Sequence, residues 1–235
     1  MKILGLDTSG LVAGVAVVEN DTLVGEFTTD YKKTHSQTLL PMLDWLRDMI
    51  ELDLDTLDAV AVASGPGSFT GLRIGSATAK GLGLALRKPL VEVPTLEGLA
   101  WNLWGTGHVV CPLMDARRNQ VYTAAYAFHP SDEGMELETL LPGQPMDVAL
   151  LCGRLSKMGR SVIFLGDGVP VYHEVLKARM QTPFLVAPAG CNRQRAANIA
   201  ALGAVYYARG RGMDAALHQP EYFRKSQAEQ NAESL

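Results

Sequence analysis

The two halves of this chain open with the same pattern: a short apolar strand ending in Asp, a polar turn, and a returning strand of small residues. Leu6-Asp7-Thr8 in the first half aligns with Met114-Asp115-Ala116 in the second. That alignment sets Val15-Ala16-Val17 against Thr123-Ala124-Ala125. Because duplication is the simplest origin of a pattern repeated this far apart, we expect two copies of one α/β unit. Chance similarity of two hairpins is the alternative interpretation.

Runs rich in Val, Leu and Thr, bounded by turn residues such as Gly10 and Asn20-Asp21, predict the strands. Longer stretches with helical periodicity predict the helices. The expected strands are 3–8, 11–18, 22–28, 58–63, 90–93, 109–114, 121–128 and 161–165, and the expected helices are 36–52, 70–87, 95–104 and 196–209. We therefore expect an N-terminal lobe over residues 1–105, a C-terminal lobe over 106–218 and a tail over 219–235. Whether the final helix packs back on the first lobe is left open.

The composition of the chain excludes several classes of protein. Hydrophobic residues make up 47% and charged residues 20%, which is typical of a soluble globular protein, and the net charge is −4. An acidic chain is not expected to be a free-standing binder of nucleic acid or membrane surfaces. No apolar run approaches a membrane span, and Asp7 comes too early for a signal peptide. The three cysteines, Cys111, Cys152 and Cys191, suggest no disulfide framework, so we expect a cytoplasmic protein.

A glycine-rich stretch, Gly65-Pro66-Gly67-Ser68-Phe69-Thr70-Gly71, lies between an expected buried strand and an expected helix. Backbone N–H groups in such a loop, next to a helix N-terminus, can bind an anion. The stretch matches neither the P-loop nor the GxGxxG spacing. A tight turn with Ser68 or Thr70 as the helix cap is the interpretation that the spacing favours. The candidate residues for a vestigial anion or nucleotide site are Asp7, Gly65, Gly67, Ser68 and Thr70.

Side chains that bind metals show no convincing pattern. Asp7 and Asp115 end strands, where a carboxylate can meet Mg²⁺ or a substrate, or can cap a turn; capping is favoured. No two of the five histidines have the i,i+3 or i,i+4 spacing of a helical metal site. We therefore predict no metal site and no bound cofactor. The histidines are His35, His108, His129, His173 and His218.

The helix expected over residues 36–52 carries two apolar stripes. One stripe, Leu39, Leu43, Leu46 and Ile50, is enough to cover a sheet. A second stripe places Trp45 between Met42 and Met49, a composition typical of interface hot spots. We expect the second stripe to bind a partner. The alternative is a helix buried on both sides within its own domain.

The helix expected over residues 70–87 has a stripe of small residues at four-residue spacing. Because each interior glycine costs roughly 1 kcal/mol relative to alanine, such a stripe indicates close approach of another element. We expect the two helices together to form a partner interface. Its predicted residues are Leu39, Met42, Trp45, Leu46, Met49, Gly71, Gly75, Ala79 and Gly83.

Charge is distributed unevenly along the chain. Residues 193–225 contain six Lys or Arg and two Asp or Glu, whereas residues 1–100 contain 8 and 13. This asymmetry is equally compatible with two interpretations. Either the basic C-terminal region contacts RNA, or it forms a charged face exposed to solvent.

Four motifs are specific enough to compare with known families. The most specific is Ser64-Gly65-Pro66-Gly67-Ser68-Phe69-Thr70-Gly71-Leu72-Arg73-Ile74-Gly75. The other three are Ile3-Leu4-Gly5-Leu6-Asp7-Thr8-Ser9, Asp115-Ala116-Arg117-Arg118 with Val121-Tyr122, and Pro220-Glu221-Tyr222-Phe223-Arg224. Together they resemble the bacterial TsaB (YeaZ) family, and the resemblance covers Met1 to about Arg224. The resemblance implies the actin/Hsp70/sugar-kinase fold of two similar α/β lobes, in agreement with the duplication.

The resemblance also implies a function. TsaB-like proteins are non-catalytic subunits that bind and support a TsaD-like paralogue, which transfers the threonylcarbamoyl group to the adenosine beside the anticodon in tRNAs reading codons that begin with A. A TsaE-like ATPase joins the complex, and this chain reaches tRNA through the complex. Whether this chain also forms a homodimer is left open. The alternative is a catalytic ATPase or kinase of the same superfold, but the turn from Asp7 to Val12 contains no lysine to meet phosphate.

Overall fold

The computed structural model describes residues 1–31, 33–131 and 134–223. These residues form two sheets with helices on their faces. The strands are β1 (Lys2–Asp7), β2 (Ala13–Glu19), β3 (Thr22–Thr29), β4 (Ala59–Gly65), β5 (Leu90–Pro94), β6 (Val109–Asp115), β7 (Gln120–Ser131), β8 (Gly134–Asp147), β9 (Val162–Leu165) and β10 (Phe184–Val186). The α-helices are α1 (His35–Met49), α2 (Phe69–Leu86), α3 (Thr95–Ala100), α4 (Val148–Lys157), α5 (Gly168–Arg179) and α6 (Ala196–Ala208), and the short 3₁₀ helices are η1 (Leu54–Thr56), η2 (Trp101–Leu103), η3 (Ala189–Cys191) and η4 (Ala215–Leu217).

Both sheets have the same topology. The first has the order β3-β2-β1-β4-β5, and the second has the order β8-β7-β6-β9-β10. In each sheet the central strand, β1 or β6, pairs antiparallel with the next strand in sequence and parallel with the strand on its other side. This repetition confirms two similar α/β lobes and the actin/Hsp70/sugar-kinase fold.

The returning strand of the second hairpin is shifted by one residue from the alignment expected from the sequence. Asp7 pairs with Gly14, whereas Asp115 pairs with Val121. The second turn is therefore one residue shorter, and Val15 is equivalent to Tyr122 rather than to Thr123. The sequence alignment was wrong here because it carried the spacing of the first turn into the second hairpin.

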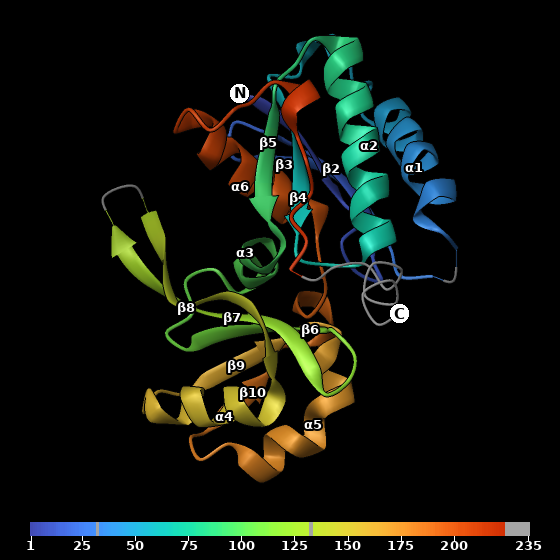
Figure 1. Cartoon of the computed structure of the whole chain (residues 1–235). Helices are drawn as coiled ribbons and strands as arrows, with labels where there is room; N and C mark the ends of the chain where they lie inside the picture. Colours follow the sequence, from blue (N-terminus) through green and yellow to red (C-terminus); the bar gives the residue numbers. More distant parts are fainter. Residues whose placement is uncertain (32, 132–133, 224–235) are drawn as a thin grey trace. The chain divides into compact units, whose positions relative to one another are not determined.

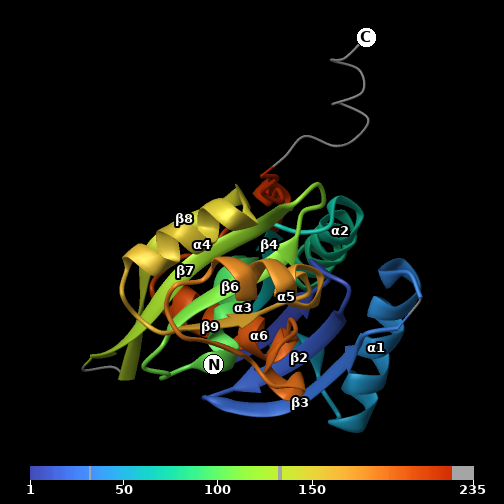
Figure 2. The ribbon, with the colours of Figure 1, turned by 90° about the horizontal axis from the view of Figure 1, so that it is seen from below.

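In the first unit, helices cover both faces of the sheet. Side chains alternate along β1, so Leu4 and Leu6 join the core beneath α1 and α2, while Ile3 lies against α6 on the other face. Helices α1 and α2 lie side by side (Figures 1 and 2), with α1 over β2 and β3, and α2 over β4. Each of these two helices therefore has one outer face that is open to solvent or to a partner.

Each unit includes a helix that follows the other unit's strands in the chain. The first unit contains Met1–Thr95 and the chain from Arg195 onward, and the second contains Leu96–Gln194. Helix α3 follows β5 yet contributes Leu96 and Leu99 to a core with Val110 and Ile163 of the second sheet. Helix α6 follows β10 yet packs on the first sheet. The units thus divide at residue 95 rather than at the expected residue 105, because α3 buries its apolar side chains in the second unit.

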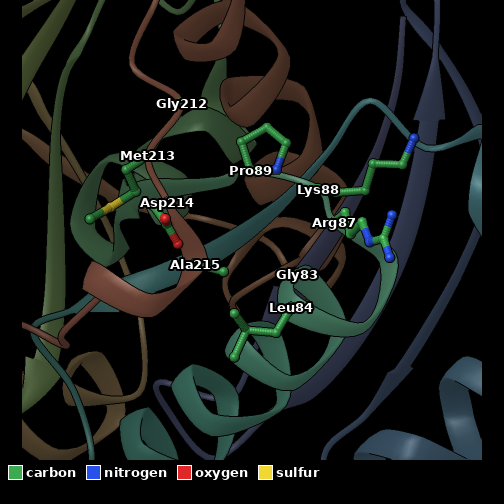
Figure 3. A pocket seen from close by; sticks show the side chains of 9 residues that line it. All are labelled: Gly83, Leu84, Arg87, Lys88, Pro89, Gly212, Met213, Asp214 and Ala215. Atoms are coloured by element: carbon green, nitrogen blue, oxygen red, sulfur yellow. The ribbon is translucent and has the colours of Figure 1, made fainter.

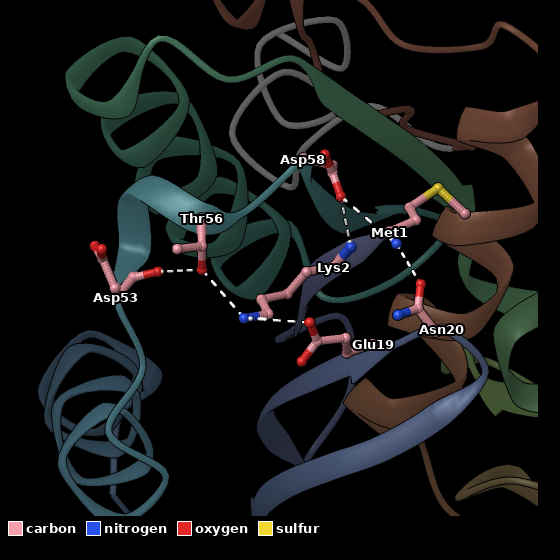
Figure 4. A network of polar contacts seen from close by, with 7 residues as sticks. All are labelled: Met1, Lys2, Glu19, Asn20, Asp53, Thr56 and Asp58. Carbon is pink, nitrogen blue, oxygen red and sulfur yellow. Dashed lines mark hydrogen bonds and ion pairs between the residues drawn. The ribbon is translucent and has the colours of Figure 1, made fainter.

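At the amino end of β1, a polar network fixes the strand to its surroundings (Figure 4). The backbone N–H of Lys2 donates to Asp58 Oδ2 at 2.6 Å. The ammonium group of Lys2 reaches Thr56 Oγ1 at 3.2 Å and Glu19 Oε1 at 3.5 Å. These partners come from the segment before β4 and from β2, so the network joins the neighbours of β1 at the end opposite to Asp7.

Candidate functional site

The carboxyl end of β1 carries a buried acidic group that is hydrogen-bonded within the turn that follows the strand. Asp7 is 2% exposed, and its Oδ1 accepts hydrogen bonds from the backbone N–H of Ser9 at 2.9 Å and from Ser9 Oγ at 2.6 Å. Burial raises the pKa of Asp7 to about 6, although the bonds from Ser9 and the nearby His35 act in the opposite direction. The side chain caps the turn, which is the arrangement that the sequence favours.

The glycine-rich loop packs on that same turn. Ser68 is the N-cap of α2, with its Oγ accepting from the Gly71 N–H at 3.3 Å, and Thr70 is exposed and does not cap the helix. The backbone N–H of Ser68 donates to the carbonyl oxygen of Ser9 at 2.7 Å. In the other direction, Thr8 Oγ1 donates to the carbonyl oxygen of Gly71 at 2.7 Å.

The glycines of this loop are required by close approach of the backbone. A Cβ on Gly67 would lie 2.3 Å from the carbonyl oxygen of Ser9, and one on Gly71 would lie 2.1 Å from that of Thr8. Either distance is far inside van der Waals contact. The chain's own turn therefore occupies the space beside these glycines that an anion would need.

A segment that we call the strap, Met213–Phe223, covers the start of the loop. The Glu221 N–H donates to the carbonyl oxygen of Ser64 at 2.7 Å, and a Cβ on Gly65 would lie 2.2 Å from the carbonyl oxygen of Glu221. The Tyr222 ring lies 4.7 Å from the Phe69 ring, centroid to centroid. The tail motif noticed in the sequence thus has a structural use in holding the start of α2.

The strap is also anchored near its middle. The ammonium group of Lys80, in α2, donates to the carbonyl oxygens of Ala216 and His218 at 3.0 and 3.1 Å. His218 is buried, and its Nδ1 lies 2.6 Å from Glu92 Oε1. That hydrogen bond is the main cause that lowers the pKa of Glu92. Between the end of α2 and the start of the strap lies a hollow of about 480 Å³ (Figure 3), lined by Gly83, Leu84, Arg87, Lys88, Pro89, Gly212, Met213, Asp214 and Ala215.

The equivalent end of β6 in the second unit has a different environment. Asp115 Oδ1 accepts from the Arg117 N–H at 2.9 Å and from the Tyr172 hydroxyl at 2.9 Å. Asp167 Oδ1 accepts from the Asp115 N–H at 3.2 Å, and burial raises the pKa of Asp167. Within the described ranges, no three or more His, Cys, Asp or Glu side chains are grouped so that they could hold a metal ion.

The predicted partner face on α1 needs correction. Leu39, Met42 and Leu46 are at most 5% exposed and belong to the core of the first unit. Met42 lies three residues after Leu39 and four before Leu46, so the helical period turns it inward rather than beside Trp45. Trp45 and Met49 are 60% and 77% exposed and remain on the outer face, as expected.

The outer face of α1 contains two further apolar residues that the sequence stripes missed, Leu40 and Pro41. Leu40 is 54% exposed and precedes Pro41, which lies four residues before Trp45. These three residues, with Leu43, Asp44, Arg47 and Leu54, line a hollow of about 460 Å³. The i+4 spacing of Pro41, Trp45 and Met49 was visible in the sequence and could have identified this face.

The predicted small-residue stripe of α2 faces inward. Gly71 and Gly75 meet Thr8, Ala79 is fully buried, and a Cβ on Gly83 would lie 2.7 Å from that of Ala215. Close approach is therefore the correct reason for this stripe, but the approaching elements belong to the same chain. The exposed residues of α2 are Ser68 at its N-cap, then Thr70, Arg73, Ala77, Gly81, Leu84 and Ala85. Of these, Ala77, Gly81 and Ala85 form a second small stripe, at the same four-residue spacing.

Comparison with known proteins adds the family. The family model described as TsaD, tRNA N6-adenosine threonylcarbamoyltransferase, matches residues 22–232. TsaB of Bacillus subtilis (strain 168), named as a tRNA threonylcarbamoyladenosine biosynthesis protein, is 33% identical over 97% of this chain and 96% of its own length. The protein of the same name from Escherichia coli (strain K12) is 36% identical over 54% of this chain and 55% of its own length. YeaZ from Pseudomonas aeruginosa superimposes with a TM-score of 0.74 at 28% identity, covering 94% of this chain and 99% of that chain.

Fold and comparisons together define the class: a protein of the actin/Hsp70/sugar-kinase fold whose curated relatives include proteins named for the biosynthesis of threonylcarbamoyladenosine in tRNA. The chain belongs to the TsaB (YeaZ) family, which confirms the resemblance carried by the motifs. In the part of the chain that the structure describes, no helix is both long and apolar enough to span a membrane.

Proposed function

We propose that this chain is a non-catalytic subunit that binds a TsaD-like paralogue and supports N6-threonylcarbamoylation of the adenosine beside the anticodon. Family membership supports the pathway, since the relatives from Bacillus subtilis and Escherichia coli are named for biosynthesis of threonylcarbamoyladenosine in tRNA. The observation that carries the proposal is the exposed outer face of α1. A tryptophan that is 60% exposed beside a methionine that is 77% exposed is costly in water and typical of an interface centre.

Helix α2 supplies the other half of the proposed partner face, which we define as Leu40, Trp45 and Met49 of α1 with Ala77, Gly81 and Leu84 of α2. A Cβ on Gly81 would meet nothing within 4 Å, so the backbone of α2 is open to close approach there. The bulky side chains on α1, together with the small residues Ala77 and Gly81 on α2, are complementary to a partner that presents a similar pair of helices. The paralogue of the same fold and a second copy of this chain both meet that description.

A structural role for the Asp7 turn supports the non-catalytic part of the proposal. The Asp7 carboxylate accepts hydrogen bonds from Ser9, and the loop glycines are in contact with Thr8 and Ser9. An anion placed against these glycines would collide with the turn. We therefore assign transfer of the threonylcarbamoyl group to the paralogue. The TsaE-like ATPase and tRNA contact this chain through the complex.

The basic C-terminal stretch gives limited support for direct contact with tRNA. Arg195 is paired with Glu26 inside the first unit, and the Arg211 guanidinium lies over the Tyr206 ring at 3.8 Å. Arg224 and Lys225 lie outside the described residues. Since part of this charge is used within the chain, we assign tRNA binding to the complex rather than to this stretch alone.

The proposal is tested by titrating the TsaD-like protein of the same organism with wild-type chain, Trp45→Asp and a matched control, Leu150→Asp. Leu150 is exposed on α4 of the second unit, so its substitution introduces the same charge on an apolar surface elsewhere. We expect Trp45→Asp to weaken binding by at least ~30-fold, about 2 kcal/mol, with an unchanged melting temperature, and Leu150→Asp to bind as wild type. Equal affinity of all three proteins, or Mg-ATP turnover by the chain alone, would contradict the proposal.

A further inference from the structure

Three successive residues of the turn after β1 each bind the start of a helix. Thr8 Oγ1 donates to the carbonyl oxygen of Gly71 in the first turn of α2, at 2.7 Å. The carbonyl oxygen of Ser9 accepts from the N–H of Ser68, the N-cap of α2, at 2.7 Å. The carbonyl oxygen of Gly10 accepts from Nε2 of His35, the first residue of α1, at 2.9 Å.

The contacts with α2 allow little adjustment. Thr8 and Ser9 are buried. The carbonyl oxygen of Thr8 lies against Gly71 of α2, and that of Ser9 lies against Gly67 in the loop just before the helix. Even a Cβ on Gly75, one turn further along α2, would lie 2.4 Å from Thr8 Oγ1. A shift of the turn by a fraction of an ångström would therefore move the start of α2 or break a hydrogen bond.

The turn is well placed to relate the two helices to each other. Helix α1 packs on β2 and β3, whereas α2 packs mainly on β4, and β1 lies between β2 and β4 in the sheet. The turn thus leaves the central strand and bonds one helix on each side. In Figure 1 the helices run next to each other.

We infer that the Asp7–Gly10 turn is a positioning element that holds the starts of α1 and α2 in register, and that it thereby sets the affinity of the partner face. This inference rests on the proposed function, because it concerns binding of the TsaD-like partner. It assigns a use to a turn that, at this place in the fold, would otherwise be a candidate for binding phosphate. Because Asp7, Thr8 and Ser9 are buried, the turn acts on the partner through the two helices.

Thr8→Val tests the inference, with Thr123→Val as its matched control. Valine has nearly the shape of threonine but cannot donate a hydrogen bond. Thr123 is also fully buried, and its Oγ1 donates to the carbonyl oxygen of Pro112 at 2.8 Å, so the control loses the same kind of bond in the second unit. We expect Thr8→Val to raise the dissociation constant about tenfold, Thr123→Val to change it less than twofold, and Thr8→Ser, which keeps the hydroxyl, to bind nearly as wild type.

A second measurement does not depend on the partner. Hydrogen–deuterium exchange on the free protein is expected to be faster in the first turns of both α1 and α2 in Thr8→Val, and unchanged there in Thr123→Val. If wild-type chain does not bind the TsaD-like protein, the proposed function fails. If wild type binds and Thr8→Val binds equally well with unchanged exchange in both helices, the inference alone is overturned.

Discussion

The ends of β1 and β6 occupy the same place in two copies of one sheet, yet they are used differently. In both, the strand ends in Asp, and Oδ1 accepts the N–H two residues later at 2.9 Å. Around Asp7 the turn is covered, because Thr8 and Ser9 are buried against the glycine-rich loop. Around Asp115 the turn is open, and the Arg117 side chain is 86% exposed.

The backbone of the two turns follows this difference. Arg117, Arg118 and Asn119 all have φ between 54° and 63°, a left-handed run that non-glycine residues rarely adopt. Such a run is tolerated where the side chains extend into solvent. Duplication therefore gives a shared capping bond, while the contacts beyond it decide whether a turn holds helices together or faces water.

The largest effects are expected from adding a methyl group to a glycine packed at the end of each central strand: Gly67 lies against the turn after β1, and Gly166 lies against Leu113 of β6. Gly67→Ala would place its Cβ 2.3 Å from the carbonyl oxygen of Ser9, and Gly166→Ala would place its Cβ 2.2 Å from that of Leu113. Each substitution is expected to lower the free energy of unfolding by about 2–3 kcal/mol in a urea titration.

Only Gly67→Ala is expected to weaken binding of the TsaD-like partner as well, because only this loop begins α2. Equal losses of affinity in both variants would mean that general destabilisation, rather than the position of α2, controls binding.

A smaller effect concerns the charge of Asp7. Because the native pKa is about 6 and the unfolded value is about 3.9, the native state favours the protonated form. The resulting stability is fully present below about pH 4 and is lost as the pH rises through 6, on the order of 2–3 kcal/mol in total.

Asp7→Asn removes this titration while keeping an oxygen that can accept from Ser9. The free energy of unfolding of wild type minus that of Asp7→Asn should therefore increase from pH 8 to pH 5. The raised pKa of Asp167 is present in both proteins and cancels in the difference. A difference that does not vary with pH would contradict this prediction, because it would show that folding does not raise the pKa of Asp7.

The smallest effect comes from two exposed helical glycines, Gly81 in α2 and Gly153 in α4, where a Cβ would meet nothing within 4 Å. Substitution by alanine is expected to raise the free energy of unfolding by about 0.5–1 kcal/mol in both cases. Only Gly81→Ala should weaken partner binding, since only Gly81 lies on the proposed partner face. Unchanged affinity of Gly81→Ala would remove the middle of α2 from that face.

Much of the fold could be predicted from local pattern, because strands that end in Asp and apolar periodicity are properties of short segments. The duplication and the capping role of Asp7 followed from such segments. The length of the second turn did not, since one residue fewer between Asp115 and Val121 leaves the composition almost unchanged. The exchange of α3 and α6 between the units was also beyond local pattern, because it depends on which sheet each helix meets.

The candidate site shows the same limit. The stripe of Gly71, Gly75, Ala79 and Gly83 correctly indicated close approach, but the sequence alone did not identify Thr8 and Ala215 as the neighbours. Met42 was misplaced because a residue between two apolar stripes can join either, and packing on the sheet decides. Strands β8 and β10 and helices α4 and α5, for which no prediction was made, complete the second unit.

The most direct test of the account is the rate of tRNA threonylcarbamoylation by the reconstituted complex, at saturating TsaD-like protein, with wild-type chain and with Asp7→Asn. A carboxylate that only caps its turn should be replaceable, so we expect the two rates to agree within about threefold. The complex should also be inactive without the TsaD-like protein. A loss above about a hundredfold, roughly 2.7 kcal/mol in the barrier, with an intact fold and an intact complex, would mean that this site takes part in the chemistry and would contradict the account.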